Sequence, residues 1–151
     1  MSRITYDWVE ETGQAVCTII EKGKIFQGFA WCREEDRDMM SSKTGLTIAE
    51  YRAHIAQSKS IRDTEIKPGL EALKKAKYAM NQSKYFNANS YEYRMLEQQI
   101  KNYEQDLIFI KNTIALQKAN LKNYLRNKAD FYERIRKNRR EGARNKANFH
   151  K

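Results

Sequence analysis

Five side chains suited to binding a nucleotide lie within ten residues near the middle of the chain. They are Tyr85, Phe86, Asn87, Asn89 and Arg94. An aromatic ring can stack on a base, an arginine can hold a phosphate through two hydrogen bonds, and an amide can bind a base edge. The same residues also suit a structural role, in which Phe86 closes a helical hairpin and the asparagines form turns and caps. The sequence leaves both interpretations open.

A second group of candidate ligands lies near the C-terminus, where aromatic and basic residues alternate. The group consists of Tyr124, Arg126, Tyr132, Arg134 and Arg136. Residues 126–151 carry ten lysines and arginines against three acidic residues, whereas residues 1–46 carry six against eight, in a chain of net charge +10. A phosphate-bearing polyanion would therefore meet the C-terminal part first. The alternative is an ordinary solvated basic face.

The N-terminal part supplies a third candidate set, formed by Trp8, Trp31 and Arg33. Trp31 and Arg33 stand at the end of a predicted strand, where loops present side chains to ligands. Tryptophans in so small a sheet also serve as core residues, so a purely structural role is the competing interpretation.

Residue patterns typical of enzymes are missing from the sequence. His54 and His150 lack a partner at the spacing of a helical metal site, and no glycine-rich phosphate loop or nucleophile elbow occurs. The acidic run at residues 34–38 offers oxygen ligands for a hard cation, but we expect it to be a solvated loop. Cys17 and Cys32 match no metal or redox spacing and are predicted to be buried thiols. We predict a binding protein that uses no cofactor and no metal.

No segment has the roughly 18 to 20 consecutive apolar residues that cross a bilayer, and the N-terminus lacks the pattern of a signal peptide. The sequence therefore predicts a protein of the cytoplasm with no membrane association.

Three short alternating runs predict a small antiparallel sheet at the N-terminus. They cover residues 4–8, 15–20 and 25–31 and are separated by turn-forming clusters. Gly28, inside the third run, is expected to mark a bulge or the close approach of another backbone. An acidic linker follows, so residues 1–45 are expected to form one β segment that needs a partner surface.

The first long helix is predicted from Thr47, where residues 47–50 have the form of a capping box, to about Asn81. Pro68 and Gly69 should kink it, because proline removes a backbone donor. Residues 82–90 form the connection, and residues 89–92 form a second capping box. These elements define a helical hairpin over residues 46–138.

A heptad repeat is the clearest signal in the second helix. One position carries Tyr93, Ile100, Leu107, Ile114, Leu121, Lys128 and Ile135, and its companion carries Leu96, Tyr103, Ile110, Gln117, Tyr124 and Phe131. The repeat predicts a helix of about 45 to 50 residues that is too long to be paired fully within the chain. The apolar overhang predicts a homodimer or higher oligomer. The basic tail, residues 139–151, is expected to fray.

The fold class is therefore predicted as α+β, a small antiparallel sheet followed by two long antiparallel helices. With the stretches FQGFAWC (26–32), SKTGLTIAEYRA (42–53), KPGLEAL (67–73) and KYFN (84–87), this order of segments resembles small bacteriophage proteins of the Thoeris anti-defence sponge family. The resemblance implies a protein that sequesters cyclic ADP-ribose isomers, and in some cases cyclic oligonucleotides, in the host bacterial cytoplasm.

The resemblance also implies a ligand pocket near a subunit interface. The matching positions would be Phe86, Asn87 or Asn89, and Arg94. Trp8 or Trp31, and Arg126 or Arg134, would be contributed across that interface.

Two other functions compete with this hypothesis. A basic coiled-coil protein would bind nucleic acid, or would act as an anti-CRISPR-like inhibitor, through its C-terminal tail. A structural or adaptor protein would use the heptad seam alone.

Overall fold

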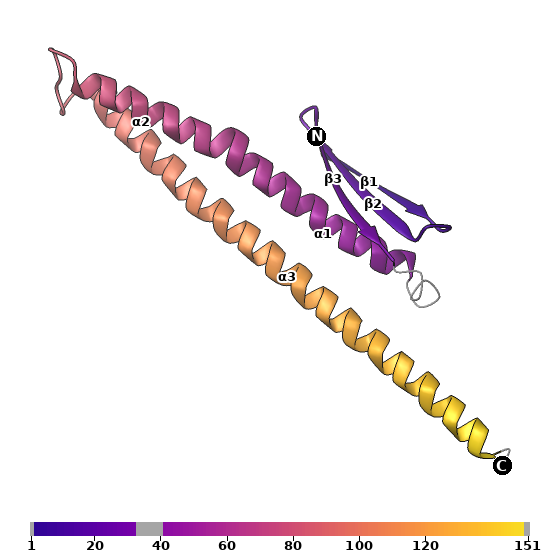
Figure 1. The fold of residues 1–151 in the computed structure, drawn as a ribbon. Helices are drawn as coiled ribbons and strands as arrows, with labels where there is room; N and C mark the ends of the chain where they lie inside the picture. The colour runs from indigo at the N-terminus through magenta and orange to yellow at the C-terminus, as the bar shows by residue number, and fades with distance from the viewer. Residues whose placement is uncertain (1, 33–40, 150–151) are drawn as a thin grey trace.

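The computed structural model describes residues 2–32 and 41–149, with side chains up to Asn145. The acidic run at residues 34–38, Arg33 and His150 therefore lie outside the described residues. Figure 1 shows a small sheet, one long helix beside it, and a second, longer helix that returns along the first. The elements are β1 (Ser2–Val9), β2 (Gln14–Glu21), β3 (Lys24–Trp31), α1 (Ser42–Ser60), the π-helix η2 (Ile61–Ile66), α2 (Lys67–Asn81) and α3 (Tyr91–Phe149). The predicted α+β architecture is confirmed.

The three predicted strands form one antiparallel sheet in the order β1-β2-β3. A two-residue turn joins β2 to β3, and both of its residues, Lys22 and Gly23, have positive φ (51° and 76°), as the twist of a tight hairpin requires. Gly28 pairs with Cys17 in an unbroken register, so it marks no bulge. Instead, a Cβ on Gly28 would overlap Ala49 O and Ala53 N of α1, which confirms the predicted close approach of a backbone.

One face of the sheet is covered by α1, and this contact forms the main core. Buried small and branched side chains meet there: Ala15, Cys17, Ile19 and Ala30 from the sheet, and Ile48, Ala49 and Ala53 from α1. Trp8, Leu121 and Tyr124 pack at the edge of this cluster. Because α3 contacts α1 but no strand, α1 is the layer between the sheet and α3.

The first helix begins earlier than predicted. Ser41 is its N-cap, and the Ser41 hydroxyl accepts a hydrogen bond from Thr44 N at 3.2 Å. Thr47 lies inside α1, where its hydroxyl donates to Lys43 O at 2.7 Å, so the predicted capping box at Thr47 is wrong. At the second helix Ser90, not Asn89, is the cap, since its hydroxyl accepts from Tyr93 N at 3.2 Å. The predicted connection, residues 82–90, is confirmed.

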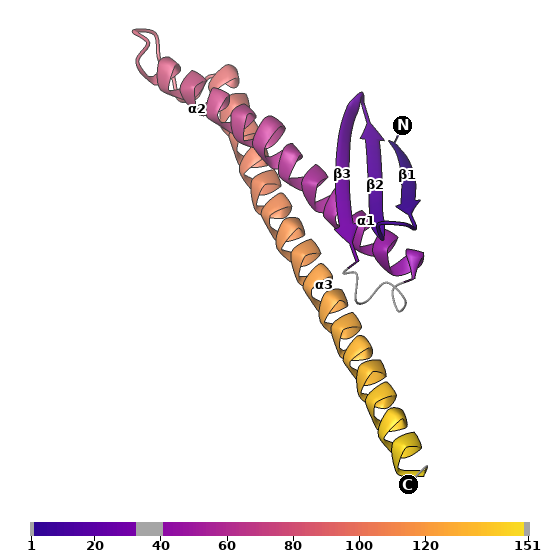
Figure 2. The ribbon, with the colours of Figure 1, turned by 45° about the vertical axis from the view of Figure 1, so that its right-hand side comes forward.

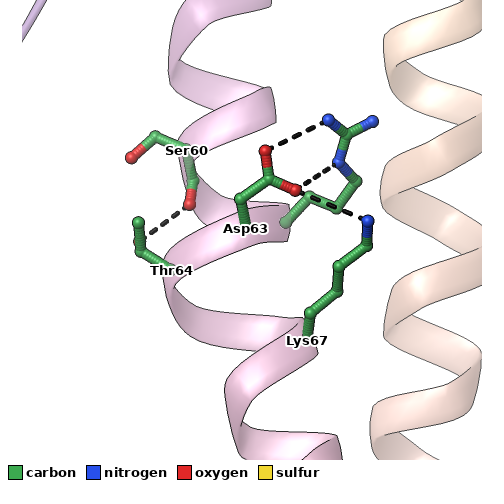
Figure 3. A network of polar contacts seen from close by, with 5 residues as sticks. Ser60, Asp63, Thr64 and Lys67 are labelled. Atoms are coloured by element: carbon green, nitrogen blue, oxygen red, sulfur yellow. Dashed lines mark hydrogen bonds and ion pairs between the residues drawn. The ribbon is translucent and has the colours of Figure 1, made fainter.

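Helical structure continues through Pro68, and the irregularity lies just before it, in η2. The wider π turn carries an N–H to O=C bond from Lys67 to Arg62, five residues back. Figure 3 shows the polar contacts around this turn: Thr64 donates to Ser60 O at 2.7 Å, and Asp63 accepts from Arg62 at 2.8 Å and lies 3.7 Å from Lys67 Nζ. The hydrogen bond from Arg62 holds the pKa of Asp63 below its ordinary value. The polar turn thus replaces the expected kink at Pro68 itself.

The heptad positions are those that α3 turns toward α1, η2 and α2. Tyr93, Ile100, Ile110 and Ile114 are buried, and Tyr103, Leu107 and Leu121 are half-buried. The helix is longer than predicted: it spans 59 residues and includes residues 139–149, which were expected to fray. In Figures 1 and 2 its C-terminal part extends past the start of α1, as the predicted overhang requires.

Candidate functional site

The overhanging part of α3 carries most of the candidate cations on an exposed surface. Between residues 126 and 145 there are eight lysines and arginines against three acidic residues. Glu133 forms ion pairs with two of these cations, Arg136 at 3.6 Å and Arg140 at 3.1 Å, within the same helix. Such exposed pairs contribute little to stability. The segment therefore keeps a surplus of positive charge on its surface.

Helical geometry separates two faces on this segment. At about 100° per residue, Arg126, Lys137 and Arg144 project to nearly the same side. Phe131 and Ile135 continue the apolar seam on the opposite side, where Phe131 is 45% exposed. Arg134 is also exposed. The predicted arginines are therefore accessible, and they stand apart from the core residues Leu121 and Tyr124.

At the hairpin end, the structure supports a structural role for Phe86 and Asn87. The Phe86 ring packs edge-on against Tyr93, with centroids 5.1 Å apart. The Asn87 side chain accepts a hydrogen bond from Asn89 N at 2.9 Å, which is an Asx turn. Phe86 closes the hairpin and Asn87 shapes the loop. Arg94 is exposed in the first turn of α3.

Exposed tyrosines at the same end are better placed than Phe86 to meet a ligand. Tyr85 is 86% exposed and Tyr91 is 73% exposed. Lys84 Nζ lies 6.0 Å from the centre of the Tyr85 ring. The sequence placed Tyr85 in this cluster but offered no signal for Tyr91, which reads as a first-turn helix residue.

The two tryptophans lie on opposite faces of the sheet. Trp8 is half-buried against the core beneath α1, so its structural interpretation is supported. Trp31 is 63% exposed on the outer face, where its ring stacks on Phe29 with 5.8 Å between centroids and 14° between planes. Strand alternation places Phe29 and Trp31 on one side, a signal that was present in the sequence.

The predicted ligand residues do not come together within one chain. Arg94 and Arg126 are 32 positions apart on one continuous helix, about 48 Å at 1.5 Å per residue. Trp31 belongs to the sheet, on the far side of α1 from α3. A pocket that uses the hairpin end and the late arginines together would require a second copy of the chain.

An open groove beside the start of α1 consists of two hollows that share Thr47 and Glu50. One hollow is also lined by Tyr6, and the other by Tyr51 and His54. Glu50 Oε1 lies 3.7 Å from His54 Nε2. Partial burial and the Glu50 carboxylate raise the pKa of Tyr6.

The groove is open and its side chains are well exposed, since His54 and Glu50 keep 40% and 37% of their side-chain surface. Tyr6 belongs to β1 and Glu50 to α1, so no local sequence motif predicts that they lie together. His54 was predicted to be an ordinary helix residue, and it lies on α1 with its side chain partly exposed. Within residues 2–32 and 41–149 no group of three His, Cys, Asp or Glu side chains could hold a metal ion.

Both cysteines are buried as thiols, as predicted. Burial, aided by the negative charge of Glu50, raises the pKa of Cys17 to about 11. Cys17 is therefore protonated at neutral pH and is not a nucleophile.

Among the helices that the structure describes, none combines the length and apolar character needed to cross a membrane. Comparisons of the chain with protein-family models, with curated proteins and with solved structures found no match.

Proposed function

We propose that this chain is a non-enzymatic binding protein whose ligand is nucleic acid, held by the C-terminal part of α3. One observation carries the proposal: the part of α3 that extends past α1 is rich in exposed cations. Helices with this charge contact successive phosphates along a backbone or lie in a groove. Among the described residues, Leu121 and Tyr124 make the core contacts of α3 that lie furthest along the helix, before most of these cations.

The expected binding is electrostatic and depends little on base sequence. Lys137 and Arg144 lie on one side of the helix, beyond Asp130, and are about 10 Å apart along its length. Duplex DNA carries one charge per about 1.7 Å of axis, so this side faces many phosphates at once. Affinity should therefore fall steeply with salt.

Fluorescence anisotropy with labelled duplex and single-stranded oligonucleotides tests the proposal at several salt concentrations. The double variant Lys137→Gln/Arg144→Gln should weaken binding and reduce the slope of log Kobs against log salt by about one per lost phosphate contact. The matched control is Lys74→Gln/Lys75→Gln on the exposed side of α2, where the charge change is the same. An equal loss in both variants, or no binding at low salt by the wild type, would contradict the proposal.

A second candidate function follows from the exposed aromatic and basic side chains at the hairpin end. There the chain would act as a sponge that sequesters cyclic ADP-ribose isomers or cyclic oligonucleotides in the bacterial cytoplasm, as the resemblance implies. Tyr85 and Tyr91 offer rings for stacking, and Lys84 and Arg94 offer cations for a pyrophosphate. These four side chains are exposed around one short connection.

Calorimetry against cyclic ADP-ribose isomers and cyclic oligonucleotides tests this candidate. Tyr85→Ala and Arg94→Gln should abolish binding without unfolding the hairpin, whereas Phe86→Ala would mix both effects because Phe86 packs on Tyr93. Tyr78→Ala is the matched control, since Tyr78 is 68% exposed on α2. No heat from any nucleotide at micromolar concentrations would exclude the sponge.

A further inference from the structure

The outer face of α3, turned away from α1 and α2, carries large exposed apolar side chains. Ile108, Phe109 and Leu116 are 61%, 71% and 63% exposed. In Figures 1 and 2 no other described element lies against this side of the helix. Exposed apolar side chains clustered on one face mark an interaction surface more often than scattered single ones do.

Uncharged residues flank Asn112 at matching distances along this face. They stand three, four and seven positions before and after it, and they are Gln105, Ile108, Phe109, Ala115, Leu116 and Ala119. All of them project within about 60° of the direction of Asn112 at 100° per residue. The three bulky apolar side chains, Ile108, Phe109 and Leu116, lie three or four positions from the centre, and Gln105 and Ala119 lie outside them. The middle of an otherwise charged helix is thus neutral and largely apolar on this side, as interface cores are.

The ends of the same face are complementary in charge. Arg94 and Asp130 lie eighteen positions before and after Asn112, which is five full turns, so both project in the same direction as Asn112. Both are exposed. Lys101 and Asn123 lie eleven positions before and after Asn112, so a cation on one side of the centre matches an amide on the other.

From this arrangement we infer that two copies of the chain pair through the outer faces of α3, antiparallel, about a two-fold axis at Asn112. In that register each residue meets the one equally far from Asn112 on the other side. Large side chains then meet their counterparts, Ile108 against Leu116, while Phe109 lies over the small Ala115. Arg94 meets Asp130 twice, once at each end. A two-fold interface requires this self-complementarity, and antiparallel pairing uses the pattern that the sequence contains.

The dimer also explains why the candidate ligand residues are separated in one chain. With the axis at Asn112, Tyr91 at the start of α3 in the second copy lies level with Glu133 of the first. The hairpin end of one copy, which carries the exposed Tyr85 and Tyr91, would then lie near the start of the basic end of the other copy. Each end of the rod would combine aromatic rings with a basic helix, about 63 Å from the opposite end at 1.5 Å per residue.

Sedimentation equilibrium of the full chain tests the pairing without any ligand, so its outcome is independent of the proposed function. The wild type should be a dimer at micromolar concentration, and Phe109→Glu should raise the dimer dissociation constant more than about tenfold. Tyr78→Glu, at an equally exposed tyrosine, should leave it unchanged, and circular dichroism should show both variants folded. A monomeric wild type at 100-fold higher concentration, or a Phe109→Glu dimer of unchanged affinity, would overturn the inference.

Disulfide trapping tests whether the two paired helices run antiparallel or parallel. In Asn112→Cys, the new cysteines of the two copies should form a disulfide with each other across the axis. Gln105→Cys and Ala119→Cys should each stay unlinked alone and link only when the two variants are mixed. Self-linking of Gln105→Cys would mean parallel helices and would contradict the arrangement.

Exchanging the charges at the two ends of the face is a second test of the register. Arg94→Asp and Asp130→Arg should each weaken the dimer, and the two together should restore it.

Discussion

Gly28 of β3 lies directly against Ala49 of α1, so closely that a Cβ on Gly28 would overlap the Ala49 carbonyl oxygen. Ala49 is itself completely buried. The helix can rest on the sheet at this depth only because neither position carries a large side chain. The spacing between α1 and the sheet, and with it the shape of the main core, depends on this contact.

Gly28→Ala should therefore destabilise the fold by about 1 to 3 kcal/mol, because the added methyl group must displace backbone and not a flexible side chain. Urea denaturation measures the loss. Gly142→Ala is the control, since a Cβ there meets nothing within 4 Å, and alanine is the better helix former. Equal stability of Gly28→Ala and the wild type would mean that α1 does not rest on β3.

The contact between α3 and η2 should be equally sensitive to loss of a buried side chain. Ile110 is 7% exposed and packs with Ile66 and Ile114. Ile110→Ala should lower the free energy of unfolding by about 2 to 5 kcal/mol, through lost burial and a residual cavity. Ile25→Ala, at a 64% exposed position of β3, should change it by less than about 0.5 kcal/mol. Similar losses in the two variants would argue against the observed register of α3.

Patterns of strong periodicity made most of the fold predictable. Alternation located all three strands, because one face of the sheet is buried under α1 and the other is not. The heptad from Tyr93 to Tyr124 located the buried side of α3 for the same reason. Ser and Asn between residues 82 and 90 gave the connection. Each of these features is local, and each depends on burial of a regular face.

Features that depend on tertiary contacts escaped prediction. The earlier start of α1 is a separate case, because it depends on a local cap at Ser41 and not on a tertiary contact. The groove of Tyr6, Glu50 and His54 joins a strand to a helix, so only the fold brings these residues together. The candidate ligand residues were predicted by type, and the heptad also predicted that Arg94 and Arg126 lie far apart along one long helix.

Alkaline pH should destabilise the protein through Cys17. The pKa of this thiol is raised to about 11 in the fold, whereas it is about 8.5 in an unfolded chain. Below pH 8 both states hold the proton, so this group adds no pH dependence there. Between about pH 9 and 11 the unfolded chain releases its proton first, and stability falls by on the order of 2 to 3 kcal/mol from this group.

Urea denaturation at pH 8 and pH 10.5 measures this change. Cys17→Ala should lose less stability between the two pH values than the wild type, although it starts from a lower value because of the cavity. Tyr6, whose pKa is also raised, acts in the same direction in both proteins. The same pH dependence in the wild type and in Cys17→Ala would show that the Cys17 thiol is not responsible.

Shortening α3 separates its anchoring part from its charged end. A chain that ends at Lys137 loses five basic residues and one acidic residue, which are Arg139, Arg140, Arg144, Lys146, Lys151 and Glu141. Among the described residues, Leu121 and Tyr124 make the core contacts of α3 that lie furthest along the helix, so the melting temperature should change by less than about 2 °C. Affinity for duplex DNA should fall, and the salt dependence of binding should become less steep. Binding of small cyclic nucleotides, measured by calorimetry, should persist if the hairpin end is the site. Unchanged affinity for DNA in the shortened chain would move the nucleic-acid surface away from the end of α3.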